Sequence, residues 1–592
     1  MMTDDDAAVF ADELEQKGQA DRANLIRWQR VRGAPWDRAV IEAAWHCDDL
    51  IAQHGDTWRA ELPALPGVTW GEFRDGFVAT AKVETFRRLH ELADQIGAAS
   101  PSMHEIVLSE RNEPNDPPPP MPWLRRLKIA TGFTDGPLQL SSNGSLVDRV
   151  PELVIEMTHY DQGQDAILPT SLKTPKYRFA MIGEHIGGQR LAGEIAACPA
   201  LQELHALELG TKFVDYNYQY YGQPTFREEG AVAIALALPH VEVLDLTRQR
   251  IGNAGFAMVG PALGLVRELQ LGVNDLTTLA PLCDGPELDR LNLYYNKIPV
   301  EELAAMPRLA ELKELVLDTC EVTDLGPVIR APWWQTLRIL DLSRNDLGKS
   351  DKLGEATPPP HLHTLRLASC DLIPGHIKQI AHLPWLDQLI ELSLDEAPLT
   401  EPLLARLGTI KKLSLRKCTG APIANVWNAV HLDLSETTCT LPHHAPNLQS
   451  LVLHSAVVDV TRLTVDGYPK LRVLDLGNVP LLGKLAPILE LAPQLQTLVM
   501  RGCQLGPADV EALVDHGVGA IELLDLRDHK PWTVETYVQL ARSKPLRAVK
   551  KFKFSAAAWR FPQPARDELE ARFGRGWGWS NDDDDPNDEE GQ

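Results

Sequence analysis

The feature that most constrains this chain is a recurring Leu-x-Leu pattern. From the middle of the sequence onward, an apolar residue, two variable residues and Leu-x-Leu are followed, after two more variable residues, by a small or amide residue. The clearest copies are LRILDLSRNDL (337–347), LHTLRLASCDL (362–372) and LRVLDLGNVPL (471–481). At 592 residues the chain is too long for an ordinary single domain, so a repeat array is expected to account for much of it.

The second leucine of each Leu-x-Leu pair marks the period of the array. Most intervals between successive markers are 19 to 27 residues. Because side chains alternate along a strand, the leucines face inward and the intervening residues face outward. One unit cannot bury its apolar face alone, but stacked units share a continuous core and a parallel sheet. The markers are Leu209, Leu246, Leu271, Leu293, Leu317, Leu342, Leu367, Leu394, Leu415, Leu434, Leu453, Leu476, Met500 and Leu526.

The pattern resembles the leucine-rich repeat, whose period is about 20 to 29 residues. The resemblance implies an α/β solenoid, a curved horseshoe with a parallel sheet on its concave face and helices on its convex face. The segments after Ile251 and Pro374 carry helix-like apolar spacing, which agrees with the strand-and-helix subclass. In this family a small inward side chain after the strand bonds to the loop backbone. Four cysteines stand where other copies have Asn, and we expect them to be structural: Cys320, Cys370, Cys418 and Cys503.

The first 100 residues lack the repeat. The series FADELEQKGQADRANLIRWQ from Phe10, DLIAQHGDTWRAEL from Asp49 and FRDGFVATAKV from Phe73 resembles the bacterial repeat-companion domain, a small module found beside leucine-rich repeats whose biochemical role is not established. The residues alone predict an amphipathic helix over 7–17, a strand over 77–83 and a helix over 84–96. We expect a mainly helical cap over residues 1–100 that hides the sheet edge of the first repeat.

Weaker copies extend the array toward both ends. They are MHEIVL (103–108), LRRLKI (124–129) and VPELVI (150–155), and VKKFKF (549–554) reads as a last strand. We therefore expect the solenoid over 101–560 and a C-terminal cap over 561–580, where ELEARFGRGW resembles the ending of the companion family. The final segment 581–592 contains seven acidic residues and almost no apolar ones, so a disordered tail is expected there.

Composition bounds the class of partner. The formal net charge is −24, whereas nucleic-acid binding needs clustered Lys and Arg, so a nucleic-acid partner is not expected. The start, MMTDDDAAVF, is acidic where a secretory signal is basic, and no apolar run reaches the roughly 18 residues of a membrane span. A cytoplasmic location is therefore expected. Eight cysteines in so long a chain do not suggest a disulfide framework.

Motifs for known chemistry are absent from the sequence: there is no phosphate-binding loop, no His-Glu-x-x-His helix and no Gly-x-Ser-x-Gly elbow. Cys47-Asp48-Asp49 superficially resembles the Cys-x-Asp nucleophile of some bacterial leucine-rich ubiquitin ligases, but its context does not resemble their large helical catalytic domain. We expect no enzymatic activity, no cofactor and no metal. A weak metal candidate, made awkward by an inward cysteine, is the set His431, Cys439, His443, His444 and His454.

A tyrosine-rich stretch, FVDYNYQYYG (213–222), lies in an interval about a dozen residues longer than its neighbours. Such surplus residues form loops, and exposed tyrosines offer large, stiff contact areas with a polar tip. We expect this insertion and outward residues of nearby strands to bind a protein. The alternative is that the insertion packs on its own solenoid. The expected binding residues are Tyr216, Tyr218, Tyr220, Tyr221, Arg290, Tyr294, Tyr295, Asp318, Arg344 and Arg366.

The sequence thus predicts a non-catalytic protein–protein interaction module, a scaffold whose partner it does not name. Two alternatives stay open. The chain could be a regulatory or recognition subunit whose partner carries an enzymatic activity, or an enzyme with unrecognised chemistry in its N-terminal module, where replacing Cys47 or His46 would abolish activity.

Overall fold

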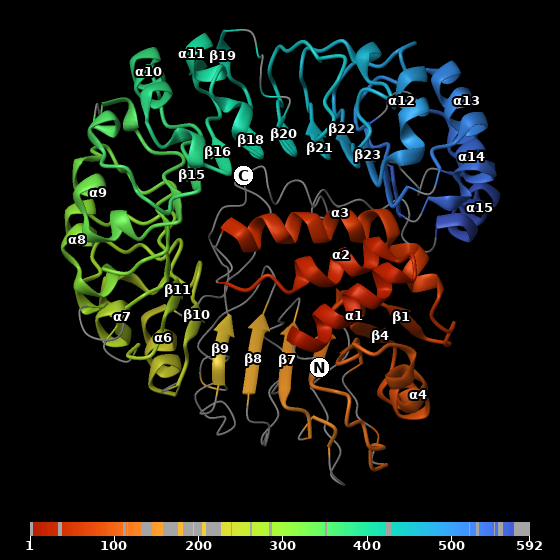
Figure 1. Ribbon diagram of the computed structural model, residues 1–592, viewed down its shortest axis with the longest axis horizontal. Helices are drawn as coiled ribbons and strands as arrows, with labels where there is room; N and C mark the ends of the chain where they lie inside the picture. The colour runs from red at the N-terminus through yellow and green to blue at the C-terminus, as the bar shows by residue number, and fades with distance from the viewer. Residues whose placement is uncertain are drawn as a thin grey trace. The chain divides into compact units, whose positions relative to one another are not determined.

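In a computed structural model of the chain, the leucine repeats form short strands that pair with their neighbours in sequence (Figure 1). The chain divides into two units, which are described separately. Unit 1 comprises Met1–Cys320 and Arg330–Ile339, and unit 2 comprises Glu321–Ile329 and Leu340–Gln592. The structure describes residues 4–33, 38–110, 114, 116–131, 145–147, 149–157, 176–181, 193, 204–208, 227–237, 240–260, 263–282, 287–349, 352–421, 423, 426, 428–519, 521–528, 532–549, 551–554 and 561–573.

The sheet of unit 1 is parallel except at its first strand. That strand, β1 (Val68–Trp70), pairs antiparallel with one edge of β4 (Thr80–Val83), the first parallel strand. The other edge of β4 pairs with β5 (Glu105–Leu108), the second parallel strand. The equivalent leucines of successive strands are in register, as in the row Leu244, Leu269, Leu291 and Leu315. The parallel strands, each paired with the next, are β4 (Thr80–Val83), β5 (Glu105–Leu108), β6 (Arg126–Thr131), β7 (Glu152–Met157), β8 (Lys176–Met181), β9 (Leu204–Glu208), β10 (Val243–Asp245), β11 (Glu268–Gln270), β12 (Arg290–Asn292) and β13 (Glu314–Val316).

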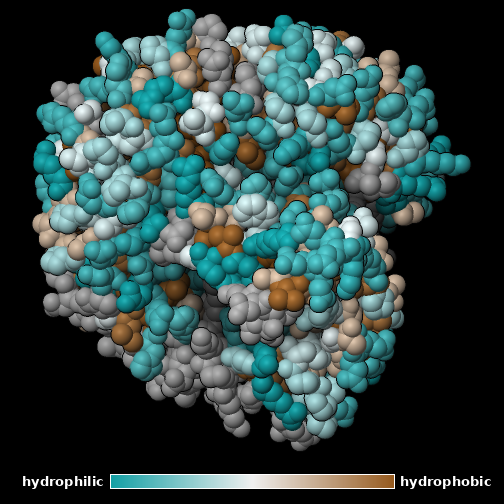
Figure 2. Space-filling model, in the orientation of Figure 1, coloured by the Kyte–Doolittle hydropathy of each residue, from teal (hydrophilic) through white to brown (hydrophobic). Residues whose placement is uncertain are grey.

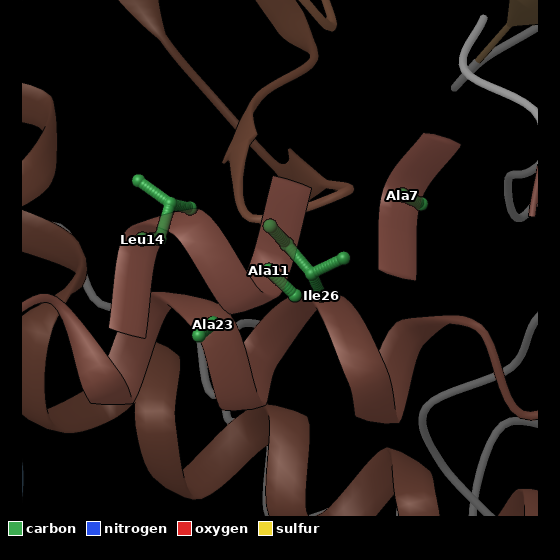
Figure 3. Packing of buried hydrophobic residues seen from close by; sticks show 5 residues of the cluster. All are labelled: Ala7, Ala11, Leu14, Ala23 and Ile26. Carbon is green, nitrogen blue, oxygen red and sulfur yellow. The ribbon is translucent and has the colours of Figure 1, made fainter. Parts of the chain in front are cut away.

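The N-terminal part of unit 1 is mainly helical, as predicted. Ala7, Ala11 and Leu14 of α1 (Asp4–Gln16) pack on Ala23 and Ile26 of α2 (Ala20–Gln29), as Figure 3 shows. Gly18 has a φ of 80° and separates these two helices. The remaining elements are α3 (Arg38–Ala60), the hairpin of β2 (Phe73–Arg74) and β3 (Phe77–Val78), and α4 (Phe86–Ala99). The region therefore fits a cap, with β1 covering the edge of the first parallel strand.

Helices and 3₁₀ turns connect the later strands of unit 1. The helix predicted after Ile251 is confirmed as α7 (Gly252–Val259). The next strand, β14 (Ile339–Asp341), begins in unit 1 and ends in unit 2. In order they are α6 (Arg227–Ala237), α7 (Gly252–Val259), η3 (Ala280–Leu282), α8 (Val300–Ala305), η4 (Pro307–Leu309) and η5 (Pro332–Gln335).

Unit 2 continues the same pattern. Its parallel strands lie along one side of the unit and its helices along the other, as Figure 1 shows for β15–β23 and α10–α14. The strands are β15 (Thr364–Arg366), β16 (Glu391–Ser393), β18 (Lys412–Ser414), β20 (His431–Asp433), β21 (Ser450–Val452), β22 (Val473–Asp475), β23 (Thr497–Val499), β24 (Leu523–Asp525) and β25 (Lys551–Lys553). A second small parallel ladder joins β17 (Pro398–Leu399) to β19 (Thr419–Gly420).

The connections of unit 2 are α9 (Gly326–Arg330), η6 (Leu347–Lys349), η7 (Leu353–Glu355), α10 (Pro374–His382), η8 (Leu386–Gln388), α11 (Glu401–Leu404), η9 (Leu407–Thr409), η10 (Val460–Arg462), α12 (Ala486–Leu491), η11 (Ala492–Gln494), α13 (Pro507–His516), α14 (Val534–Arg542), η12 (Pro545–Ala548) and α15 (Gln563–Phe573). Leu569 of α15 is buried against Tyr537, Ala541 and Phe554, so this helix closes the core at the last strand. Residues 581–592, where a disordered tail is predicted, lie outside the described residues.

The inward residue three positions after the second leucine of the Leu-x-Leu pair links neighbouring repeats by hydrogen bonds. Asn274 donates from Nδ2 to the carbonyls of Leu246 (2.8 Å) and Leu271 (2.9 Å), and its Oδ1 accepts from the amides of Gln249 and Ile251. The four cysteines at this position also donate to the carbonyl of the second leucine one repeat earlier, with Sγ–O distances of 3.1, 3.1, 3.1 and 2.9 Å. The structural role predicted for Cys320, Cys370, Cys418 and Cys503 is confirmed.

The predicted α/β leucine-rich-repeat solenoid, with a small mainly helical N-terminal cap, is therefore confirmed. Its marker leucines are almost fully buried, for example Leu271, Leu293 and Leu317. The opposite sheet face consists of the residues that alternate with the leucines and the residue directly after each second leucine. We call it the polar face.

Candidate binding surface

The tyrosine predicted to face outward, Tyr294, lies flat on the polar face of unit 1. A side chain at Gly272, the equivalent position of the preceding strand, would bring its Cβ to 2.2 Å from Cδ1 of Tyr294. The missing side chain at Gly272 therefore makes room for the ring. Arg248, one repeat further back, donates from Nε to the Tyr294 hydroxyl at 2.8 Å, and its Cζ lies 6.0 Å from the ring centroid. One aromatic ring thus spans three repeats.

Tyr295 follows at the turn that leaves β12. Its φ is 55°, and the equivalent residue of other repeats is also left-handed, as in Val273, Thr319 and Glu396. The turn is held by the Tyr295 amide, which donates to the carbonyl of Asp318 at 2.9 Å. Tyr295 is 47% exposed, so much of its ring is accessible. A left-handed non-glycine residue is uncommon, and its recurrence here shows that the repeat geometry imposes it.

The other predicted residues of unit 1 are engaged within the sheet. Arg290 lies between two carboxylates, with Nη1 3.5 Å from Glu268 Oε2 and Nε 3.2 Å from Glu314 Oε2. Asp318 is 8% exposed and accepts from the Thr319 hydroxyl at 2.8 Å. Both side chains belong to the polar face, but their contacts inside the chain limit what they can offer to a partner.

The two predicted residues of unit 2 are Arg344 and Arg366. Arg344 occupies the left-handed turn position after β14, with a φ of 54°. Arg366 repeats the arrangement of Arg290, with Nη1 3.5 Å from Asp341 Oδ2 and Nε 2.7 Å from Glu391 Oε1. The structure therefore groups Arg290, Tyr294, Tyr295 and Asp318 on β12, β13 and the residues that directly follow these strands.

The tyrosine-rich residues Tyr216, Tyr218, Tyr220 and Tyr221 lie outside the described residues. The nearest described residues on either side are Glu208, which pairs in register with Asp245 of β10, and Arg227, whose amide donates to the carbonyl of Gln249 at 3.0 Å. Gln249 is the neighbour of Arg248, so the chain after the tyrosine-rich residues returns beside the residue that holds Tyr294.

The sequence had given no reason to single out Arg248 and Gly272. Both could be found by aligning the repeats, because the glycine stands at a position that carries larger side chains in most other copies. Figure 2 shows hydrophilic residues over most of the coloured surface in its view, with hydrophobic residues in small separate groups. A partner that contacts the coloured surface in this view would therefore meet mixed rather than continuously apolar side chains.

The surroundings of Cys47 do not favour a nucleophile. The side chain is 8% exposed, and burial, with a smaller effect of Asp48, raises the pKa of its thiol to about 11. Reactive cysteines instead have lowered pKa values. His46 is stacked on Trp28, with ring centroids 4.4 Å apart. These environments match the structural interpretation of the N-terminal helices.

Metal and membrane sites can be assessed for the described residues. Among them, no group of three or more His, Cys, Asp or Glu side chains is arranged to hold a metal ion. In the predicted histidine set, Cys439 is buried and burial raises its pKa to about 11, which disfavours the thiolate that a metal needs. No helix in the described part of the chain is long and apolar enough to cross a membrane.

Comparison with known proteins agrees with the repeat. A family model described as Leucine Rich repeat matches residues 335–350, which include the copy from 337 to 347. No curated protein matches the chain. Among solved structures, an internalin from Listeria monocytogenes is 19% identical with a TM-score of 0.40, covering 56% of this chain and 94% of the internalin chain.

A second similar structure is the leucine-rich-repeat ectodomain of the plant membrane receptor kinase GASSHO1/SCHENGEN3 from Arabidopsis thaliana, in complex with CASPARIAN STRIP INTEGRITY FACTOR 2. It is 15% identical with a TM-score of 0.35, and the match covers 83% of this chain and 60% of the ectodomain chain. The fold assignment rests on the register and burial of the repeats described above.

Proposed function

We propose that this chain is a non-catalytic binding protein that holds a protein partner on the polar face of β10–β13, together with the tyrosine-rich segment 213–226. The observation that carries the proposal is the position of Tyr294, whose ring lies across Gly272 and whose hydroxyl is held by Arg248. A ring fixed in this way offers contact area at little cost in side-chain entropy on binding.

The neighbouring residues support the same surface. Tyr295 is half exposed beside it, and an exposed tyrosine combines a large apolar body with a polar tip. The segment with Tyr216, Tyr218, Tyr220 and Tyr221 is followed by Arg227, whose amide bonds to the carbonyl of Gln249 beside Arg248, so we include these tyrosines in the binding surface. Arg290 and Asp318 would frame it. Arg344 and Arg366 stay predicted binding residues of unit 2.

The test is affinity capture from the native cell with the full chain as bait. Three baits are compared with wild type: one lacking 213–226, the double variant Tyr220→Ala/Tyr294→Ala, and the control Ile373→Ala/Leu482→Ala. The control removes exposed apolar side chains of unit 2, at 53% and 65% exposure. If the tyrosines are central contacts, the first two baits should lose at least about tenfold of the captured partner, and the control should lose none.

Capture of the same proteins in the same amounts by the double tyrosine variant would overturn the proposal. Circular dichroism of each bait, compared with wild type, shows that a loss of capture is not a loss of fold. Enzymatic assays on the captured complex then show whether the partner carries an activity, which is the case of a recognition subunit.

A further inference from the structure

The polar face of β10–β13 has an uneven charge. Its described positions carry one basic residue, Arg290, and four acidic ones: Asp245, Glu268, Glu314 and Asp318. Arg248, at the turn after β10, adds a second positive charge beside Tyr294, so the acidic residues still outnumber the basic ones. The corresponding positions of β15–β24 in unit 2 are balanced, with five basic and five acidic residues. The basic ones are Arg366, Lys412, Arg416, Arg501 and Arg527, and the acidic ones are Glu391, Asp395, Asp433, Asp475 and Asp525.

Arg290 does not offset this excess. Its guanidinium lies 3.5 Å from the carboxylate of Glu268 and 3.2 Å from that of Glu314, so one positive charge is shared by two negative ones. The three side chains together keep a charge of −1 on three adjacent strands. Glu268 and Glu314 are 32% and 24% exposed, so their carboxylates still reach solvent.

Like charges also meet at the edge of this region. Asp245 of β10 pairs in register with Glu208 of β9, and directly opposed like charges are unfavourable in a sheet. Burial, with a smaller contribution from Glu208, raises the pKa of the Asp245 carboxyl above its ordinary value, although the Thr247 amide and hydroxyl act against this. A positive charge brought to this part of the surface would relieve the repulsion.

The aromatic ring adds a second attraction for cations. A guanidinium or ammonium group near the face of a tyrosine ring is attracted by its negative π face. The chain itself contains such a contact, because the Cζ of Arg248 lies 6.0 Å from the centroid of Tyr294. The ring lies between strands that carry Asp245 and Asp318, so carboxylates are present on both sides.

We propose that the polar face of β10–β13 binds an extended protein segment rich in arginine or lysine. The proposal rests on the proposed function and names the chemistry of the partner. Four strands spaced about 4.8 Å apart span about 14 Å, which is the length of about five extended residues. A basic side chain of that segment would contact the Tyr294 ring, and others would approach Glu268 and Glu314.

The test uses a fluorescein-labelled peptide with a core of about five residues, in which arginine alternates with serine. Its control has citrulline, the neutral isostere, in place of each arginine. Binding to the full chain is measured by fluorescence anisotropy at salt concentrations from about 50 to about 300 mM. The arginine peptide should bind, the citrulline peptide should not, and the affinity should fall as salt screens the charges.

We call the arrangement of Arg290 between Glu268 and Glu314 a bracket. Substitutions of its acidic and basic residues should change the affinity for the arginine peptide in opposite directions. Glu268→Gln and Glu314→Gln should each weaken peptide binding by about threefold, the effect of one unit charge about 6 Å away in water-like surroundings. Arg290→Gln should strengthen it by a similar factor. Glu391→Gln removes the same charge from the equivalent bracket around Arg366 in unit 2, and it should change the affinity by less than about 1.5-fold.

Three results would overturn the inference. The first is equal affinity for the arginine and citrulline peptides, and the second is weaker binding of the arginine peptide to Arg290→Gln. The third is a loss of affinity in Glu391→Gln as large as that in Glu268→Gln, because the peptide would then be attracted by the total charge of the protein. Each of them leaves the proposed function standing if partner capture still depends on Tyr220 and Tyr294. Conversely, capture that is unaffected by those tyrosines removes the proposed function even if the peptide binds.

Discussion

The inward asparagines of the repeat make a sharp prediction about stability. Asn274 is fully buried, donates to two leucine carbonyls and accepts from the amides of Gln249 (3.1 Å) and Ile251 (3.3 Å). Replacement by Ala removes one partner from each of these four backbone groups. The Gln249 amide and the Leu246 carbonyl keep their mutual bond of 3.3 Å, and the Leu271 carbonyl keeps the Asn296 side-chain amide at 2.9 Å. Since an unsatisfied buried group costs about 1 to 3 kcal/mol, and most of the cost falls on the Ile251 amide, we expect a loss of about 2 to 3 kcal/mol.

Replacement of Asn274 by cysteine should lower the free energy of unfolding, but by less than replacement by alanine. A thiol can donate to the preceding leucine carbonyl, as Cys320 does to Leu293 at 3.1 Å, but it cannot replace the amide oxygen that accepts from two backbone N–H groups. Asn274→Cys is therefore expected to cost about half as much as Asn274→Ala. The matched control Cys370→Ala removes one weak thiol donor and a small volume, and should cost about 1 kcal/mol.

Hydrogen exchange measured by mass spectrometry gives a local readout, together with urea denaturation. The amides of Gln249 and Ile251 should exchange at least about tenfold faster in Asn274→Ala, because each 1.4 kcal/mol of lost local stability is a factor of ten. Peptides from β20–β22 in unit 2 should keep wild-type rates. Equal destabilisation by Asn274→Ala and Cys370→Ala, or unchanged exchange at 249 and 251, would refute the reasoning.

Two further predictions concern charged side chains. Arg22→Met should destabilise the N-terminal helices by about 2 kcal/mol, because the guanidinium lies 5.1 and 5.2 Å from the centroids of the Trp58 and Phe77 rings. Glu61→Gln should cost under about 0.5 kcal/mol, because Glu61, the ion-pair partner of Arg22, is 54% exposed. Equal shifts of the thermal denaturation midpoint in the two variants would contradict this. Burial, followed by the charges of Arg416 and Arg501, lowers the pKa of His454 from 6.5. As pH falls, the imidazole of His454 is therefore protonated in the unfolded state before it is protonated in the folded state. The free energy of unfolding should accordingly fall as pH drops below 6.5, and it should fall less in His454→Gln. Urea denaturation at two pH values measures this difference, and an identical pH dependence of the two proteins would count against it.

The fold could be predicted because one pattern encodes two properties at once. Leu-x-Leu sets the strand period and identifies the residues that face the core. Markers such as Leu246 and Leu476 accordingly lie directly after β10 and β22 and are buried. The inward position was equally legible, since Cys370 and Asn296 stand at the same distance from their leucines and both donate to the carbonyl of the second leucine one repeat earlier.

The strand β8 was missed because Lys176–Met181 lacks the Leu-x-Leu pattern. It pairs with β7 and β9 nonetheless, with an irregular register between Tyr177 and Arg178. Its apolar residues Tyr177, Phe179 and Met181 alternate in register with Leu153, Ile155 and Met157 of β7, but none of them is leucine, so the repeat pattern did not reveal them. The antiparallel strand β1 was missed for a related reason, because three residues carry too little periodicity.

The binding surface was legible only in part. The sequence identified Tyr294 as outward, but not that its ring lies on Gly272 and reaches Arg248, since this depends on side-chain direction across three repeats. It also gave Arg290 and Arg366 as exposed charges without their carboxylate partners. Aligning the first position of each strand would have shown Glu268, Arg290 and Glu314 in adjacent rows.

Among the described residues, an arginine lies between two carboxylates of the neighbouring strands three times. Arg126 lies 3.5 Å from both Glu105 and Glu152, and the arrangements around Arg290 and Arg366 use the same atoms, Nη1 toward the preceding strand and Nε toward the following one. Such a bracket fixes the charged side chains before any partner arrives, so little rotamer entropy remains to be lost on binding. Each bracket also keeps one excess negative charge. The arginines therefore order acidic groups on the sheet. In the proposed site the ordered carboxylates are those of Glu268 and Glu314, and together with the Tyr294 ring they would select a basic segment.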